Sequence, residues 1–419
     1  MSPLRRRLHA VAALLAESRD LLEARGRDVA PPSIEGRGWT GFLEGLDDVE
    51  LDALEIGGSA ARWPERTPPS LVALAAAARE VETLDVLASP GARVEADSPL
   101  RRGETPRKRA QVDAFVRAVA PLVEARARGG AGDVVDVGAG HGHLTRALSE
   151  RLGVPVLGLE RDAARVARAR ALPSLSAPSS FASFALSDVV RDGLPIGRGA
   201  LALGLHACGE LGDLVVEVAA ARGASVALVG CCLQKRRAST RRTLEGAPDL
   251  PSCPSPPSLP SLPSAVRELP KGLLGLSNLS ARDQGVEATR EENLAGRRRR
   301  LELGWLLEQR GCPAGEELLG LNRRAARGDL ATLTGRAFAA RGLPPATRAE
   351  LDAAEAFGAA RHARMRRWAL PRALLARPLE VFVALDRACH LERHGHTVTV
   401  GTLFHADVSA RNVMVLAQA

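Results

Sequence analysis

The sequence of 419 residues has no tyrosine and very little lysine, so arginine carries nearly all of its positive charge. Its only lysines are Lys108, Lys235 and Lys271. A formal net charge of +8 points toward nucleic acid, because clustered Arg and Lys release counterions from phosphates. Here the excess positive charge is almost entirely arginine, in a chain rich in alanine. This indicates a compositional bias of the whole sequence as much as a nucleic-acid partner. Charge alone therefore does not define a nucleic-acid-binding protein.

The sequence also lacks a spaced set of cysteines and a long apolar run. Two of its six cysteines, Cys231 and Cys232, are adjacent, which is not a disulfide framework and favours a reducing cytoplasm. No window approaches the run of about 18 apolar residues that a membrane span needs. The N-terminus is basic and then apolar, but His9 interrupts it and a charged amphipathic pattern follows, so a helix is favoured over a signal peptide. We expect a soluble, cytosolic protein with no membrane partner.

The length allows two or three domains, and the 45% apolar residues supply ample core. Pro and Gly breaks and shifts in composition predict the following division: a helical N-terminal domain over 1–100, a core over 101–245, a proline-rich linker over 246–264, an Arg-rich helical insertion over 265–370, and a C-terminal helix with closing strands over 371–419. In the insertion, the run Arg297 to Arg300 fits a solvated helix face better than a nucleic-acid contact.

The core alternates strands and helices. A helix capped by Thr105, with Pro106 at its first position, is predicted to end at Gly129. Apolar runs beyond it predict five strands with crossovers, at 134–137, 154–159, 181–186, 201–205 and 226–229, with helices at 144–152 and 211–221 between them. This alternation predicts an open α/β sheet that binds its ligand at the carboxyl ends of the strands.

The first predicted strand ends in a glycine-rich loop, VVDVGAGHGHLT, from Val134 to Thr145. A dinucleotide fold needs the spacing G-x-G-x-x-G, in which the helix N-terminus holds a pyrophosphate. Gly138, Gly140 and Gly142 are spaced G-x-G-x-G instead. S-adenosylmethionine (SAM) has no pyrophosphate and needs only a backbone that passes close to its ribose and methionine parts, which glycine permits. The loop therefore favours SAM over NAD.

Acidic residues follow three of the predicted strands. Asp136 ends the first and could receive the ammonium of a methionine moiety, whereas Glu160 ends the second and could accept both ribose hydroxyls. An acid at Glu160 would serve NAD equally, so the glycine spacing discriminates between the two. Asp188, after the third strand, is a candidate for the adenine amino group or a helix cap or turn residue.

Several motifs resemble those of one family. LHACGEL and VGCC stand at the ends of the fourth and fifth predicted strands, and GETPRKRAQVDAF, WTGFLEGLDDVELDAL, WPERTPPSL, LEVFVALDRACHLE and DVSARNVMVLA extend the likeness to both ends of the chain. Together they resemble the methyltransferase-like protein 25 family, SAM-dependent methyltransferases also described as ribosomal RNA adenine dimethylase domain-containing. The resemblance implies a seven-stranded Rossmann-like methyltransferase sheet, a SAM loop at Gly138, Gly140 and Gly142, and a ribose acid at Glu160. Where the family commonly has Tyr and His after its paired cysteines, this chain has Leu233 and Gln234.

LHACGEL and VGCC also carry the candidates for chemistry. His206 could take a proton from an oxygen or ring-nitrogen nucleophile, or simply bond to backbone at a strand end. Cys208 could be a covalent nucleophile or a small buried residue. These two with Cys231 and Cys232 could form a zinc site, but adjacent cysteines rarely bind one tetrahedral ion well, so no metal is predicted and the pair is placed on the substrate side. LHACGEL has neither proline nor aromatic residue, so adenine dimethylation does not follow.

The first turn of the helix after Thr105 holds three cations, Arg107, Lys108 and Arg109. Positive charge at a helix N-terminus opposes the helix dipole and costs a few tenths of a kcal/mol per residue, unless an anion offsets it. The methionine carboxylate or a substrate phosphate would do so, and a tolerated solvated turn is the alternative.

These observations predict a SAM-dependent methyltransferase. RNA is the leading acceptor class, and a protein or small-molecule acceptor stays open. A NAD-dependent oxidoreductase would share the glycines and Glu160, and a non-catalytic SAM- or RNA-binding module would fit the missing Tyr and His.

Overall fold

A computed structural model describes the chain except for residue 27 and residues 88–103, 130–131, 173–180, 246–260 and 280–288. Most of the predicted proline-rich linker thus lies outside the described residues. The chain forms two compact units: unit 1 comprises residues 1–19, 78–281 and 375–419, and unit 2 comprises residues 20–77 and 282–374.

Unit 1 is a mixed α/β structure. Its helices are α1 (Pro3–Glu17), α7 (Pro106–Gly129), α8 (His143–Leu152), α9 (Ala163–Ala171), α10 (Val189–Asp192), α11 (Glu210–Arg222), α12 (Ser264–Arg267), α13 (Lys271–Leu274), the 3-10 helix η2 (Gly275–Asn278) and α18 (Ala376–Arg393). Its strands are β1 (Val134–Val137), β2 (Val156–Glu160), β3 (Ala182–Leu186), β4 (Leu201–Leu205), β5 (Ser225–Val229), β6 (Thr240–Arg242), β7 (Glu268–Pro270), β8 (Thr397–Thr402) and β9 (Val413–Gln418). The five predicted core strands and the two closing strands are all present.

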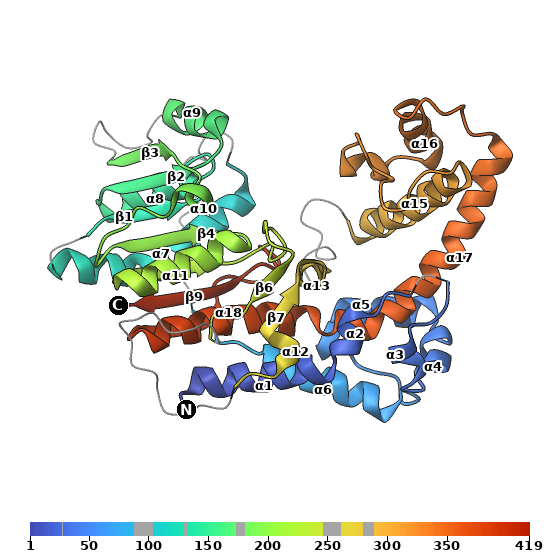
Figure 1. The fold of residues 1–419 in the computed structure, drawn as a ribbon, viewed down its shortest axis with the longest axis horizontal. Coiled ribbons are helices and arrows are strands. Elements are labelled where there is room, and N and C mark those ends of the chain that lie inside the picture. Colours follow the sequence, from blue (N-terminus) through green and yellow to red (C-terminus); the bar gives the residue numbers. More distant parts are fainter. Residues whose placement is uncertain (27, 88–103, 130–131, 173–180, 246–260, 280–288) are drawn as a thin grey trace. The chain divides into compact units, whose positions relative to one another are not determined.

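The centre of unit 1 is a seven-stranded sheet in the order β3-β2-β1-β4-β5-β9-β8 (Figure 1). β1 to β5 run parallel, and β9 is antiparallel to both of its neighbours, β5 and β8. The strand order reverses between β1 and β4, which is where open α/β sheets bind their ligands. The predicted fold class, a seven-stranded Rossmann-like methyltransferase core, is confirmed.

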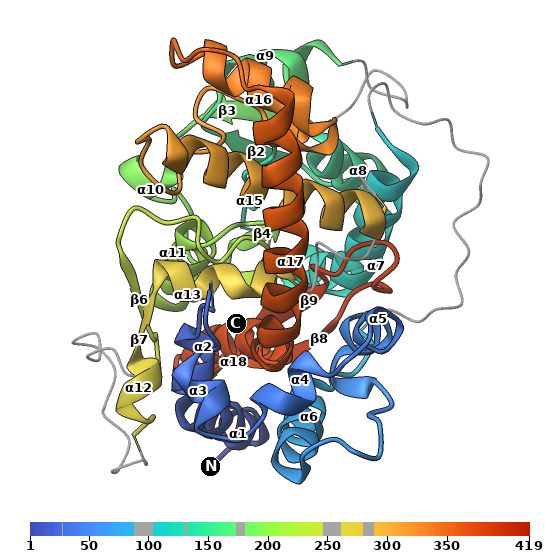
Figure 2. The same cartoon turned by 90° about the vertical axis from the view of Figure 1, so that its right-hand side faces the viewer.

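Helices cover both faces of this sheet. α7 and α8 lie on one face and α10 and α11 on the other (Figure 2), and α18 packs against α11, β8 and β9. β1, β4 and β5 are buried throughout, as expected of parallel strands covered on both sides. α7 contributes Val112, Phe115 and Val119 to the main core, together with Leu144 and Leu148 of α8. These apolar residues of α7 recur at helical spacing and form the face that the core buries.

A small antiparallel sheet of β6 and β7 was not predicted. Arg241 pairs with Leu269 at its centre, so residues at the start of the predicted helical insertion belong to unit 1. Three-residue strands carry too little alternation to be recognised in a sequence, and their partners lie across the proline-rich segment.

Unit 2 is helical. It contains α3 (Pro32–Glu35), α4 (Thr40–Glu44), α5 (Asp48–Gly57), η1 (Gly58–Ala60), α15 (Arg290–Gln309), η3 (Arg323–Arg327), α16 (Leu330–Ala339) and α17 (Arg348–Ala373), together with most of α2 (Arg19–Glu23) and the first part of α6 (Pro69–Glu82). Capping boxes start α5, α15 and α17. α15, α16 and α17 share an apolar core around Leu303, Leu333 and Phe338.

The two units divide the chain differently from the predicted domains. Residues 20–77 and 282–374 form one unit, because Arg290 and Arg366 both pair with Asp52 and Glu55 of α5. The first helix of the predicted N-terminal domain, α1, belongs to unit 1, where it packs against α18. Local patterns predict helices, but ion pairs between residues more than 200 positions apart are not visible in them.

Across the described residues, no helix combines the length and the apolar character that crossing a bilayer requires.

Candidate active site

The predicted site residues gather where β1, β2, β4 and β5 end. These parallel strands deliver their carboxyl ends to one edge of the sheet, and the first turn of α7 contributes side chains to the same region. The arrangement follows from the parallel order, because each loop after a strand opens at the same edge.

The glycine loop after β1 needs its glycines. Gly138, Gly140 and Gly142 have φ values of +78°, +59° and +77°, in the left-handed region that residues with a Cβ rarely adopt. A Cβ at Gly142 would also lie 2.5 Å from the ring of Phe184, so the start of α8 packs directly on β3. A Cβ at Gly140 would meet no described atom within 4 Å. The space beside Gly140 is therefore open to a ligand.

Glu160 faces this loop from the end of β2. Its side chain is buried, and one carboxylate oxygen accepts the Gly140 N–H at 2.9 Å while the other accepts the Asp162 N–H at 3.0 Å. Each oxygen keeps a second lone pair, because a carboxylate has about four acceptor sites. The carboxylate is thus held rigidly beside the open space, with acceptors left for two hydroxyl groups.

Asp136 is the second buried acid, at the carboxyl end of β1. Thr145 of α8 donates its hydroxyl to the Asp136 carboxylate at 2.7 Å. Burial raises the pKa of Asp136 to about 6, although the Thr145 hydrogen bond and the positive charge of Lys108 oppose this rise. A carboxylate destabilised in this way gains from a cation placed against it. Thr145, which lies in the glycine-loop motif, is a site residue that the sequence analysis missed.

The pKa of Asp136 predicts how SAM binding depends on pH. The carboxylate is charged above about pH 6, so the predicted attraction for a methionine ammonium would be present there and lost on acidification. We expect the Kd for SAM to rise about tenfold for each pH unit below 6, as measured by titration calorimetry. Asp136→Asn should bind SAM weakly at every pH, without this dependence. A wild-type affinity that stays constant from pH 7 to pH 5 would contradict the assignment.

The three cations at the start of α7 do not form a fully solvated turn. Thr105 caps the helix, accepting the Lys108 N–H at 3.2 Å. Burial lowers the pKa of Lys108, against the opposing charges of Asp136 and Glu104. Lys108 therefore lies close to Asp136 of β1. Their attraction offsets part of the free-energy cost of a positive charge at the helix N-terminus. Arg107 and Arg109 are half-buried.

His206 follows β4 in an unusual backbone conformation. Its φ of +73° makes it the one non-glycine residue with positive φ in the part of the chain described here. Its Nε2 lies 3.0 Å from Oε1 of Gln111 on α7. Burial and the charges of Lys108 and Arg107 lower the pKa of His206 to about 3, so its ring is neutral at physiological pH. Strain of this kind is held in place by the surrounding structure and concentrates at functional sites.

Gln111 is the partner that the sequence analysis did not find. Its side chain is buried, and its amide nitrogen has no hydrogen-bond partner among the residues that the structure describes. It lies 95 positions before His206 along the chain, so no local pattern connects the two. A buried, unpaired amide donor costs free energy and points to a ligand group that would satisfy it.

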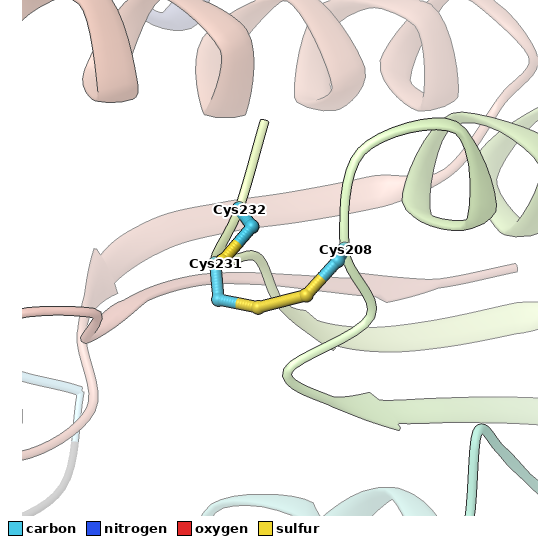
Figure 3. A group of neighbouring side chains, drawn as sticks. All are labelled: Cys208, Cys231 and Cys232. Atoms are coloured by element: carbon cyan, nitrogen blue, oxygen red, sulfur yellow. A yellow bond between two sulfur atoms is a disulfide. The ribbon is translucent and has the colours of Figure 1, made fainter. Parts of the chain in front are cut away.

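The cysteines at the ends of β4 and β5 differ from the prediction. Cys208 and Cys231 are joined in a disulfide, and Cys232 beside them has a free thiol (Figure 3). Cys208 therefore has no free thiolate to act as a nucleophile while this bond is present. The sequence shows no spaced disulfide framework and did not predict this pair, because the neighbouring parallel strands β4 and β5 bring together two cysteines that are 23 residues apart.

Asp188 lies just before α10 but makes no capping hydrogen bond through its side chain. Its carboxylate pairs with the largely exposed Arg237, which follows β5, at 3.2 Å. This pair brings the loop after β3 close to the loop after β5. Asp188 therefore occupies the N-cap position of α10 without capping it through its side chain, and its adenine role stays a prediction.

Arg411 is a third residue that the sequence analysis missed, although it lies in the DVSARNV motif. Its buried guanidinium donates to the carbonyl of Cys231 and to Oδ1 of Asn278. Its charge also helps to lower the pKa of His206. Arg411 therefore links the loop before β9 to the loop after β5.

Unit 2 has two further features, a cavity and the arginine run from Arg297 to Arg300. Unit 2 has a cavity of about 710 Å³ lined by Asp28, Glu35, Glu44, Arg364, Arg367 and Trp368, none of them a predicted site residue. In the run from Arg297 to Arg300, Arg298 pairs with Glu302 and Arg299 donates to the carbonyl of Arg327, so much of its charge is used within unit 2.

The strand order, the left-handed glycine loop and the two buried acids define a class of protein, the Rossmann-like methyltransferases. The family described as "Methyltransferase domain" matches residues 107–239, which span α7 to the loop after β5. Residues 107–239 therefore form a methyltransferase domain, which supports the activity of a SAM-dependent methyltransferase. Among solved structures, a sugar N-methyltransferase from a Streptoalloteichus species is similar, with 19% identity over 35% of this chain and 60% of that chain, and a TM-score of 0.23.

Proposed function

We propose that this protein transfers the methyl group of SAM to a nucleophile in RNA, positioned between the carboxyl ends of β4 and β5. One observation supports the binding of SAM in this proposal: both carboxylate oxygens of buried Glu160 accept backbone amides next to the open space at Gly140. The residues fit SAM. Glu160 would hold the ribose hydroxyls, Asp136 the ammonium, and the glycine loop would lie against the methionine and ribose parts.

The cofactor supplies a methyl group on a sulfonium, whose leaving group is already activated. The protein then contributes mainly proximity and orientation. Asp136 and Glu160 come from adjacent strands β1 and β2, and each carboxylate is anchored by a neighbouring hydrogen bond. Both ends of the cofactor would be held against rigid elements, with its reacting centre toward β4.

On the acceptor side, we propose that His206 orients the nucleophile. Its Nε2–H donates to Oε1 of Gln111, which leaves Nδ1 with a free lone pair. With a pKa of about 3 the ring is a weak base, but it can accept a hydrogen bond from a neutral N–H and aim the nitrogen lone pair. This arrangement suits a nitrogen nucleophile better than a hydroxyl group, which must lose its proton to react.

RNA is the proposed acceptor class because positive charge gathers at this edge of the sheet. Arg107 and Lys108 begin α7, and Arg237 is largely exposed after β5. Such charges would bind phosphates and position an acceptor without reading its sequence. The resemblance to the methyltransferase-like protein 25 family points the same way, and membership in that family is part of this proposal.

Transfer of labelled methyl from SAM into an extract of cells lacking the protein tests the proposal. Wild type should label material that ribonuclease releases, and Glu160→Ala should label almost nothing. His206→Ala should bind SAM normally but transfer about tenfold more slowly, for the loss of one orienting hydrogen bond. Glu308→Ala, at an exposed glutamate of α15, is the matched control and should behave as wild type.

The same experiment separates the alternatives. Release of the label by protease would move the acceptor to protein, and label in small molecules would move it to metabolites. SAM binding without any transfer would support a non-catalytic binding module. Stabilisation by NAD and not by SAM in a thermal-shift comparison would support an oxidoreductase, which the methyltransferase domain does not favour.

A further inference from the structure

Three sulfur atoms meet at the carboxyl ends of β4 and β5. The Sγ atoms of Cys208, Cys231 and Cys232 all lie within 4.8 Å of one another (Figure 3). Two of them form the disulfide described above, and the third belongs to a free, partly exposed thiol. A structural disulfide explains two of these cysteines and leaves the position of Cys232 unexplained.

The backbone holds the loops that carry these cysteines close together. A Cβ at Gly209 would lie 2.0 Å from the carbonyl oxygen of Lys235, so only glycine fits there. The Glu210 N–H donates to the same carbonyl at 3.1 Å, and the His206 N–H donates to Val229 at 2.9 Å. Both loops are therefore fixed by backbone contacts that do not depend on the sulfur atoms.

The objection to two adjacent cysteines binding one ion applies to an extended strand, in which neighbouring side chains point to opposite sides. Cys231 and Cys232 lie outside any strand, because β5 ends at Val229. The chain turns directly after them, with the Lys235 N–H donating to the Cys232 carbonyl at 2.9 Å. Both sulfur atoms can therefore approach a single point from this loop.

We propose that Cys208, Cys231 and Cys232 in their thiol form bind one thiophilic d¹⁰ cation, Zn²⁺ or Cu⁺, through three thiolates. Thiolates about 2.3 Å from a tetrahedral Zn²⁺ lie about 3.8 Å from one another, which these sulfur atoms reach with small movements. The three ligands are all soft, and soft thiolates select such metals over Mg²⁺ or Ca²⁺. This inference does not rest on the proposed methyl transfer.

The charge of the surroundings supports the site. Three thiolates with one divalent cation carry one net negative charge, which would be costly to bury unpaired. Arg411 donates to the Cys231 carbonyl, which places its guanidinium charge beside the cluster. The cluster thus sits in positive surroundings that favour thiolates over thiols. Three protein ligands also leave a fourth position on Zn²⁺ free, which is typical of catalytic zinc sites.

Metal binding by the reduced, full-length chain tests the proposal. The protein is reduced with a phosphine, stripped with chelator and titrated anaerobically with Zn²⁺ against a chromophoric chelator, and in a second arm with Cu⁺. We expect one equivalent to bind, and Co²⁺ in place of Zn²⁺ to give thiolate-to-metal charge-transfer absorption. The ion for which the protein competes more strongly against the chelator is the ion that the site prefers.

Cys232→Ser is the decisive variant, because it leaves the Cys208–Cys231 pair able to form its disulfide. It should weaken binding by more than about 100-fold, since the loss of even an outer-shell partner costs 10- to 100-fold. Cys312→Ser, in unit 2, is the matched control and should bind as wild type. The absence of stoichiometric binding by the reduced wild type would overturn the proposal, as would unchanged affinity in Cys232→Ser. Either result would leave a disulfide as the role of Cys208 and Cys231.

Discussion

Replacing Glu160 by alanine is expected to weaken SAM binding by about 1–3 kcal/mol, or roughly 5- to 150-fold in Kd. The reason is that two ribose hydroxyls would lose their acceptor in a site where water cannot replace it well. Glu160 is only 7% exposed, and its oxygens already hold the amides of Gly140 and Asp162. Calorimetric titration of SAM into wild type and variant measures the difference directly.

Two further variants separate the ribose contact from the support of the loop. Glu160→Gln keeps one carbonyl oxygen and should lose less affinity than Glu160→Ala, and Glu308→Ala should lose none. Thermal unfolding without ligand shows whether the glycine loop tolerates the change. If a folded Glu160→Ala protein bound SAM as tightly as wild type, Glu160 would not belong to the cofactor site.

Asp213→Asn is expected to lower the free energy of unfolding by about 3–5 kcal/mol, because it removes one partner from a buried ionic network. Asp213 of α11 is bonded to Arg236, to Arg241 of β6 and to Arg387 of α18, at 2.8 to 3.0 Å. Burial opposes its ionisation, yet Arg241 and Arg387 lower the pKa of Asp213 to about 2. Without the carboxylate these guanidinium groups would repel one another in a space that excludes water.

The same network predicts the sign of an acid dependence. The unfolded chain protonates Asp213 near its ordinary pKa of about 3.9, whereas the folded chain does so near 2. The stabilisation is therefore present above about pH 4 and is lost as the pH falls toward 2. Asp213→Asn should unfold with a smaller acid dependence over that range, as urea titrations at several pH values would show.

Asp352→Asn is the matched control, because its pair with Arg348 lies on the surface of α17 and should contribute little. A loss below about 1 kcal/mol in Asp213→Asn would contradict the role of the network. The network also reaches the loop after β4, since Arg387 donates to the Gly209 carbonyl at 3.0 Å. Its loss should therefore also loosen the loop that carries His206 and Cys208.

Short-range features were predictable because their causes are local. The strand from Val134 to Val137 has the predicted bounds, and the Thr105 cap starts α7 as expected. The three glycines of the loop do occupy the left-handed region, where a Cβ is unfavourable. Residues at the ends of parallel strands could be grouped in advance, since strand polarity places those ends at one edge.

Partners from distant parts of the chain were not predictable. Gln111 meets His206 and Cys208 meets Cys231 only because α7, β4 and β5 are packed side by side. The division into two units was not predictable for the same reason. Asp52 forms ion pairs with Arg290 and Arg366, which lie more than 200 residues away along the chain.

The sequence by itself determined the α/β core, the glycine loop and the acids that follow the strands, because periodicity, turn chemistry and strand polarity act over a few residues. The tertiary structure alone decided the ionisation of Asp136, the neutral state of His206, the pairing of the cysteines and the ionic network around Asp213. Each of these depends on burial and on charges that folding brings together from far along the chain, and neither is encoded in a local pattern.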